Sequence, residues 1–435
     1  MPARKPRAPA TLLDAVKARD LEATRALLDA GADPDAPGPY DERPLGAAVY
    51  ARILHPEVDA IASLLMARGA DPQKVGAFDA TPLELAAQHG AEVIAQEMMR
   101  VVGPRFAPRA AQGTRLSLLQ CACQGGLRWL VARCVALGQS DREITADGRS
   151  CLHLATSVNP QSESPPAERL ALVDELLARG ADPNLRRPGE WGGTPLHSAA
   201  ASADAAVVTR LLDAGASLDA RSDVSGHQPI HRAAYGERVD VVAALCARGA
   251  DVTSTAAGGA QPLHLLGART RYLATSAMVD AFVDHGADIN ALDDRGVSPL
   301  AAAIGQHGNT RAPLDAREVA TLARFVARGA DLRCAAPGGA TLLILAGRLG
   351  DAALAQIALG GSEIGQVDGH GWSALHYAAT QADGAVAGAL LAAGADPTQP
   401  TRKRHTAART AFPAGSTAKD IARALGAAAV LERLA

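Results

Sequence analysis

The chain has 435 residues, of which 48% are hydrophobic and 20% charged, so it can bury a large core. Its net charge of −3 argues against binding to nucleic acid or to an anionic membrane. No apolar run is long enough to span a bilayer, and the basic first residues are not followed by the apolar stretch of a signal peptide, so we expect a cytoplasmic protein.

Helix-pair patterns begin at residue 10, after a tail at 1–9 that we expect to be disordered. Three units occupy 10–103, and the third opens with Thr81-Pro82-Leu83. An irregular connector rich in proline and arginine follows at 104–116. Two alternatives for this connector are a bend in the array of units and a break in it.

Eight further units are predicted over 117–397, and the two clearest stand next to each other. One contains Thr194-Pro195-Leu196-His197 and the other Gln228-Pro229-Ile230-His231, so the two histidines are 34 residues apart (231 − 197). A basic linker is predicted at 398–416 and a capping unit at 417–435.

Three units carry extra residues between their two helices, at 51–58, 158–167 and 305–313. Long surface loops add little to the free energy of folding. We therefore expect that removal of 158–167 leaves the fold intact.

The residue types within one unit suit a pair of short helices. The Thr194 hydroxyl can accept a hydrogen bond from a free N–H at a helix start, and Pro195 fits the first helical position. Val207 and Leu211 lie at helical spacing, and Gly215 follows the last turn, where a left-handed residue is favoured. Such a helix pair cannot bury its own apolar faces, so it must stack on its neighbours.

The Thr-Pro-Leu-His motif, repeated at a period of about 33 residues, resembles the ankyrin repeat. The resemblance extends from residue 10 to the C-terminus and implies an all-α solenoid of about twelve helix–turn–helix units with short hairpin loops. It also implies recognition of another protein by the concave face that loop tips and first helices form. The departures from the motif are mild and lie at Cys151, Gln228, Gln261 and Ala374.

Five histidines occupy the fourth position of the motif, one in each of five units. We expect each to hydrogen-bond its own loop and the neighbouring loop rather than a metal; they are His153, His197, His231, His264 and His376. His227 and His231 have the spacing of two zinc ligands on a helix, but Pro229 lies between them. The six cysteines lack the spacing of a zinc site or a disulfide scaffold, so we expect no metal and no cofactor.

Motifs of catalysis or phosphate binding are absent from the sequence, which favours a non-enzymatic protein. The less favoured alternative is an enzyme, or a regulator with a small-molecule pocket. The basic run Arg402-Lys403-Arg404 is short, and we interpret it as a solvated part of the linker rather than a nucleic-acid site.

Aromatic residues make up only 3% of the chain, and aromatic and arginine side chains are the usual anchors of protein interfaces. Five residues occupy the predicted loop tips before the motif, and a tyrosine follows one first helix on the same side. The sequence therefore predicts six partner-binding residues, Trp191, His227, Tyr235, Arg295, His370 and Trp372. The alternative is that Tyr235 and Trp372 pack against adjacent loops.

The predicted function is that of a monomeric scaffold or adaptor that binds another protein. The excess of alanine, glycine and arginine suggests a bacterial source. Two narrower alternatives are a secreted effector that docks on a host protein and an immunity-type or chaperone-like partner of a toxin or enzyme.

Overall fold

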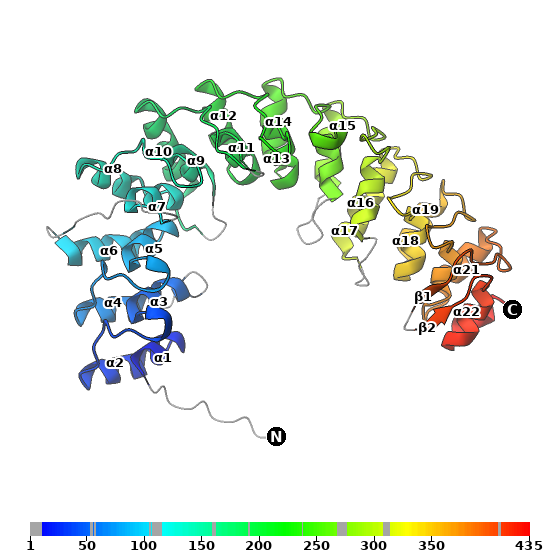
Figure 1. The fold of residues 1–435 in the computed structure, drawn as a ribbon, viewed down its shortest axis with the longest axis horizontal. Coiled ribbons are helices and arrows are strands. Elements are labelled where there is room, and N and C mark those ends of the chain that lie inside the picture. Colours follow the sequence, from blue (N-terminus) through cyan, green and yellow to red (C-terminus); the bar gives the residue numbers. More distant parts are fainter. Residues whose placement is uncertain are drawn as a thin grey trace. The chain divides into compact units, whose positions relative to one another are not determined.

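The computed structural model describes residues 11–52, 55, 58–103, 106, 115–158, 162–189, 192–236, 238–267, 276–307, 314–407 and 410–435. The chain divides into two compact units, Met1–Asp223 and Val224–Ala435. Paired helices make up most of the described part of each unit (Figure 1), which confirms the predicted all-α class. None of the described helices combines the length and apolar character needed to cross a membrane.

In the first unit each repeat contributes two helices, so along the chain first helices alternate with second helices. They are α1 (Leu12–Lys17), α2 (Leu21–Asp29), α3 (Pro44–Arg52), α4 (Asp59–Ala67), α5 (Pro82–Gln88), α6 (Glu92–Val102), α7 (Leu118–Gly125), α8 (Arg128–Ala136), α9 (Cys151–Thr156), α10 (Pro166–Ala178), α11 (Pro195–Ser202) and α12 (Ala205–Asp213). Two 3₁₀ turns, η1 (Pro39–Asp41) and η3 (Ala77–Asp79), lie in hairpin loops.

The second unit continues the alternation. Its helices are α13 (Pro229–Gly236), α14 (Val239–Ala247), α15 (Ser276–Asp284), α16 (Pro299–His307), α17 (Ala316–Ala327), α18 (Leu342–Leu349), α19 (Ala352–Leu359), α20 (Ala374–Ala378), α21 (Ala385–Ala392), α22 (Ala418–Leu425) and α23 (Ala428–Arg433). It also contains the 3₁₀ segments η5 (Ala257–Gly259) and η6 (Pro262–Gly267) and the strands β1 (His405–Ala407) and β2 (Thr410–Phe412).

Local sequence explains where the first helices start and stop. Thr81 caps α5 through a reciprocal pair of hydrogen bonds with Glu84, Thr81 N–H to Glu84 Oε2 at 2.9 Å and Glu84 N–H to Thr81 Oγ1 at 3.1 Å. Gly126 ends α7 with φ +78°, a left-handed conformation that glycine adopts without steric cost. The motif residues therefore act at the helix ends, as the sequence predicts.

Small residues let the first helices of successive repeats pack closely within the first unit. Helix α5 packs on α7, α7 on α9 and α9 on α11, with fully buried alanines at positions such as Ala86, Ala122 and Ala155. The contact between α5 and α7 spans the connector at 104–116, so this segment does not break the row of first helices. Burial of alanine and leucine accounts for a core with few aromatic residues.

Two helix glycines are expected to respond oppositely to alanine. A methyl group on Gly125 would lie 1.8 Å from the carbonyl oxygen of Ala87, so α7 must move away from α5 and we expect a loss of about 1–3 kcal/mol of folding free energy. Gly46 in α3 has no atom within 4 Å of the same position. Gly46→Ala should therefore stabilise by about 0.5–1 kcal/mol. Urea denaturation of both variants checks this, and equal effects would contradict it.

The extra segment of the fifth repeat is docked on preceding repeats rather than free. The Ser162 hydroxyl donates to Gly125 O (3.1 Å), and the Ser164 hydroxyl donates to Gly126 O (3.0 Å). Glu163 forms an ion pair with the buried guanidinium of Arg52 in α3. These bonds attach the described part of the segment to the second and fourth repeats, so removal of 158–167 would break them, and the effect of that removal on the fold stays a prediction.

Two details of the second unit differ from the sequence analysis. The first helix of the eighth repeat is the 3₁₀ segment η6, where Gln261 stands in place of the usual capping hydroxyl. The predicted linker at 398–416 contains an antiparallel hairpin in which His405 pairs with Phe412 and Thr406 with Ala411. Alternation along β1 and β2 turns Ala407 and Phe412 inward, so this segment is folded on the eleventh repeat.

Candidate partner-binding surface

Hairpin loops that precede the first helices are joined edge to edge in the second unit. Ala257 N–H donates to Ser225 O (2.9 Å), and Asp294 N–H donates to Gly258 O (3.0 Å). Further along, Gly369 N–H donates to Gly338 O at 2.6 Å. Within each unit, we call the hairpin loops that precede the first helices, together with the exposed side chains of those helices, the loop-side surface of that unit.

Motif histidines tie one repeat to the next. In α9, Ser150 N–H donates to His153 Nδ1 (3.2 Å), so Nε2 carries the proton and donates to Gly193 O (3.1 Å) of the following repeat. The same bond joins His264 to Val297 (3.1 Å). Equivalent bonds join His231 to Ala260 and His376 to Gln399. The predicted structural role is thus confirmed for these four histidines.

Acid is expected to weaken these links. Burial lowers the pKa of His153, His264 and His376, and the bonds to backbone carbonyls oppose the shift only in part. The unfolded chain takes up these protons near pH 6.5, whereas the folded chain takes them up only at lower pH. Their contribution to stability is therefore complete above about pH 6.5 and is lost as the pH falls.

Urea midpoints at pH 7.5, 6.5 and 5.5 measure this dependence. We expect the midpoint to fall through this series and His376→Gln to show a smaller fall than the unsubstituted chain. A midpoint that stays constant or rises toward pH 5.5 would show that the buried histidines do not control stability.

Large apolar side chains are exposed on the loop-side surface. Tyr40 is 96% exposed, Val224 62% and Leu292 64%, and all three lie in loops that precede a first helix. Tyr50, on the first helix α3, is 66% exposed. Val93 and Val101, on the second helix α6, are exposed to a similar extent, 68% and 49%.

Two predicted binding residues are exposed as expected. The side chain of Arg295 is 72% exposed and donates from Nη2 to Asp293 Oδ2 (2.9 Å). His370 is exposed at the tip of its loop, and its ring lies 4.5 Å from that of His405. The structure places both residues on the loop-side surface of the second unit.

His227 and Tyr235 are half-buried beside α13. The rings of His227 and His231 stack at 5.4 Å, and the Arg232 guanidinium lies 5.9 Å from the centre of the Tyr235 ring. Burial, with the Arg232 charge adding to it, lowers the pKa of His227 to about 4, so this histidine is neutral at pH 7. Each residue has only part of its ring available to a partner.

The prediction that Trp372 is exposed is wrong, because its side chain is 0% exposed. Its ring packs against Tyr377, His405 and Phe412, with centroid distances of 5.0, 4.9 and 5.8 Å. The C-terminal hairpin supplies two of these rings and covers the tryptophan. Trp191, the other predicted tryptophan, lies outside the described residues.

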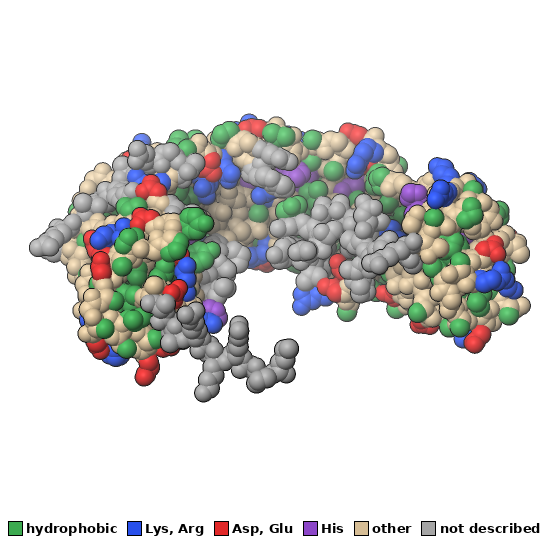
Figure 2. All heavy atoms as spheres, turned by 60° about the horizontal axis from the view of Figure 1, so that its bottom comes forward, with side chains coloured by type: hydrophobic (Ala, Val, Ile, Leu, Met, Phe, Trp, Pro, Cys, Tyr) green, Lys and Arg blue, Asp and Glu red, His purple; other side chains and the backbone are tan. Residues whose placement is uncertain are grey.

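Potential metal ligands are dispersed in the described ranges. They include no group of three His, Cys, Asp or Glu side chains that could hold a metal ion. Figure 2 shows histidine side chains at separate places on the visible face rather than in one cluster. Of the six free cysteines, Cys121, Cys123, Cys134 and Cys151 are buried, and Cys246 and Cys334 are half-buried.

Comparison with known protein families identifies the repeats. Residues 167–256 match a family model of three ankyrin repeats, and residues 370–402 match a model of a single ankyrin repeat. The chain therefore contains ankyrin repeats, a class of helical repeat that generally acts as a non-enzymatic protein-interaction module. The fold inferred from the Thr-Pro-Leu-His motif is confirmed.

Curated relatives share part of this region. The chain is 36% identical over 138 residues to human neurogenic locus notch homolog protein 2, which is 31% of this chain and 5% of that protein. It is 32% identical over 136 residues to notch homolog protein 1 of Xenopus tropicalis, 31% of this chain and 5% of that protein. Human notch homolog protein 1 is 30% identical over 154 residues, 35% of this chain and 6% of that protein. The chain thus spans about one-twentieth of the length of these relatives.

Proposed function

We propose that this chain is a non-enzymatic, monomeric scaffold that binds a partner protein through the loop-side surface. The observation that carries the proposal is the position of the exposed apolar side chains Tyr40, Tyr50, Val224 and Leu292 on loops and on a first helix. Burial of such side chains against a partner supplies the main favourable free energy of association.

Backbone geometry at the most exposed aromatic residue supports the same surface. Tyr40 and Asp41 have φ of +59° and +57°, a left-handed conformation that costs non-glycine residues free energy. The Arg43 side chain braces this loop by donating to Asp35 O (2.6 Å) and Val75 O (2.7 Å). A strained, braced loop that presents an exposed tyrosine is typical of a binding element.

Capture of partners from a lysate of the source organism, with chemical crosslinking and mass spectrometry, tests the proposal. Two loop-side variants, Tyr40→Ala/Tyr50→Ala and Val224→Ala/Leu292→Ala, are compared with the unsubstituted chain. The matched control is Val93→Ala/Val101→Ala on the second helix α6, where the valines are 68% and 49% exposed.

We expect at least one loop-side variant to bind the captured protein at least tenfold more weakly, with an unchanged melting temperature. The α6 control should bind within twofold of the unsubstituted chain. Failure to capture any protein, or a control that loses as much affinity as the loop-side variants, would overturn the proposal.

A further inference from the structure

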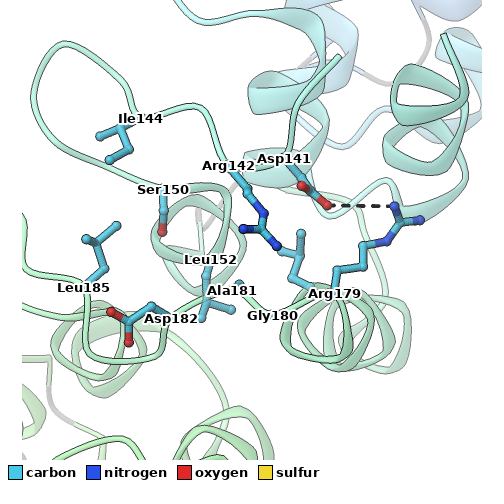
Figure 3. Close-up of a pocket in the computed structure, with 11 residues that line it drawn as sticks. Asp141, Arg142, Ile144, Ser150, Leu152, Arg179, Gly180, Ala181, Asp182 and Leu185 are labelled. Atoms are coloured by element: carbon cyan, nitrogen blue, oxygen red, sulfur yellow. Dashed lines mark ion pairs between the residues drawn. The ribbon is translucent and has the colours of Figure 1, made fainter. Parts of the chain in front are cut away.

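A pocket of about 170 Å³ opens between the end of the fourth repeat and the fifth repeat of the first unit (Figure 3). Leu152, Leu176, Leu185 and Ile144 provide its apolar lining, and Ile144 is 51% exposed. Charged side chains, among them Asp141, Arg142 and Arg179, also line it. An apolar cavity of about 150 Å³ engineered in another protein binds benzene, so this volume suits a group as large as a leucine side chain.

The pocket lies where the chain departs from its own repeat pattern. Most repeats end in a glycine followed, three positions later, by an apolar residue, but the fourth repeat has Asp141 at that position. The apolar residues in the other repeats are Pro34, Pro72, Pro183, Leu218, Val252, Ile289, Leu332, Ile364 and Pro397. Val252, Ile289 and Leu332 are 4, 8 and 7% exposed, whereas Leu218 and Ile364 are half-buried at this position.

Backbone geometry shows that Asp141 and Leu332 are equivalent positions. Gly138 and Gly329 have φ of +89° and +90°. Gly138 N–H donates to Val135 O (2.9 Å), and Gly329 N–H donates to Val326 O (3.0 Å). The two helix ends thus have the same conformation and differ in the side chain that follows.

In the ninth repeat the leucine extends toward the following repeat. A methyl group built on Gly361 of the next repeat would lie 3.2 Å from Leu332 Cδ1, so the leucine reaches that glycine. Gly361 lies two residues after the end of α19, and Gly180 of the fifth repeat lies two residues after the end of α10. Gly180 and Asp141 both line the pocket. The pocket therefore corresponds to the side of the repeat toward which Leu332 extends in the ninth repeat.

Asp141 is held at the rim and does not fill this space. Its carboxylate forms an ion pair with Arg179 at 3.8 Å, and Figure 3 shows that pair directed to one side of the pocket. The carboxylate of Asp182 accepts a hydrogen bond from Asn184 N–H (2.8 Å). Arg142 is exposed, and its Nη2 lies 3.8 Å from a methyl position on Gly180.

We propose that this pocket receives a leucine, isoleucine or valine side chain of a partner protein, with an acidic residue next to it facing Arg142. The inference rests on the proposed function and specifies one anchor of the interaction. The partner side chain takes the place that Leu332 has in the ninth repeat, and the Arg142 guanidinium attracts the neighbouring carboxylate.

Selection of random twelve-residue peptides displayed on phage against the full chain tests this proposal. The decisive variant is Asp141→Leu, which fills the pocket with the residue type found in the ninth repeat. Ala181→Met fills it from the opposite wall, and Asp141→Asn is the matched control that removes the charge and leaves the pocket open. Melting temperatures establish that each variant is folded, and we expect Asp141→Leu to melt no lower than the unsubstituted chain.

We expect the selected peptides to share an aliphatic residue beside Asp or Glu. As synthetic peptides they should bind Asp141→Leu and Ala181→Met at least tenfold more weakly and Asp141→Asn within threefold. Replacement of the shared aliphatic residue by alanine should cost at least tenfold in affinity.

Peptides that bind Asp141→Leu as well as the unsubstituted chain would overturn the pocket proposal, as would a selection without such a shared residue. A captured partner that depends on Tyr40 and Tyr50 or on Val224 and Leu292, but binds Asp141→Leu normally, would overturn the pocket and leave the proposed function standing. If no partner protein is captured from the lysate, the proposed function itself is overturned.

Discussion

Replacement of Trp372 by alanine is expected to destabilise the second unit by about 3–5 kcal/mol. The tryptophan is 0% exposed, and its ring lies between Tyr377 of α20 and the hairpin residues His405 and Phe412. Truncation would leave a cavity beneath β1 and β2, and the hairpin would lose the apolar surface on which it folds. Its effect on binding should follow from lost structure rather than from a lost contact.

Urea denaturation followed by circular dichroism measures the loss, and hydrogen exchange at the paired residues His405 and Phe412 reports on the hairpin. His370→Ala is the control, because His370 is exposed and has a ring contact with His405 at 4.5 Å. It should change stability by less than about 0.5 kcal/mol. A Trp372→Ala variant with an unchanged midpoint and a protected hairpin would contradict the packing role.

Replacement of Arg169 by methionine is expected to destabilise the first unit by about 2–4 kcal/mol. Arg169 is 3% exposed, and burial lowers the pKa of its guanidinium. Its Nη1 donates to Ala155 O (3.0 Å) and Gln124 O (3.3 Å), and its Nη2 donates to Ser162 Oγ (3.1 Å). Methionine retains much of the apolar stem but leaves buried carbonyl oxygens without these bonds.

Arg210→Met provides a matched comparison. Arg210 lies on the surface of α12, where its Nη1 donates to Asp174 Oδ1 at 2.7 Å, and its side chain is 45% exposed. Exposed ion pairs contribute at most about 1 kcal/mol. Urea denaturation should therefore separate the two variants clearly, and equal losses would show that the docked segment adds nothing to the stability of the repeats.

Sequence periodicity was sufficient to predict the helical repeats, because their determinants are local. Thr81 stands at the predicted start of α5, and Gly215, predicted to be left-handed after the last turn of its unit, has φ +85°. The role of the motif histidines also followed from the sequence, since His153 and Gly193 stand at fixed positions in successive repeats. In a stack of similar units, each repeat contacts only its neighbours, so the motif that specifies one repeat also specifies its contacts with the next.

Features that depend on segments outside the motif were decided only in the folded chain. The loop position of Trp372 indicated exposure, but the hairpin that buries it belongs to a segment whose charged residues suggested a linker. The segment at 162–164 resembles a free loop in sequence, yet it hydrogen-bonds to Gly125 and Gly126 of the preceding repeat. The pocket at Asp141 likewise depends on tertiary structure, because it is lined both by Asp141 at the end of the fourth repeat and by Gly180 at the end of the fifth. Local sequence determined the repeated unit. The docked segments and the pocket depend on tertiary contacts that do not recur from repeat to repeat, so a repeated motif cannot predict them.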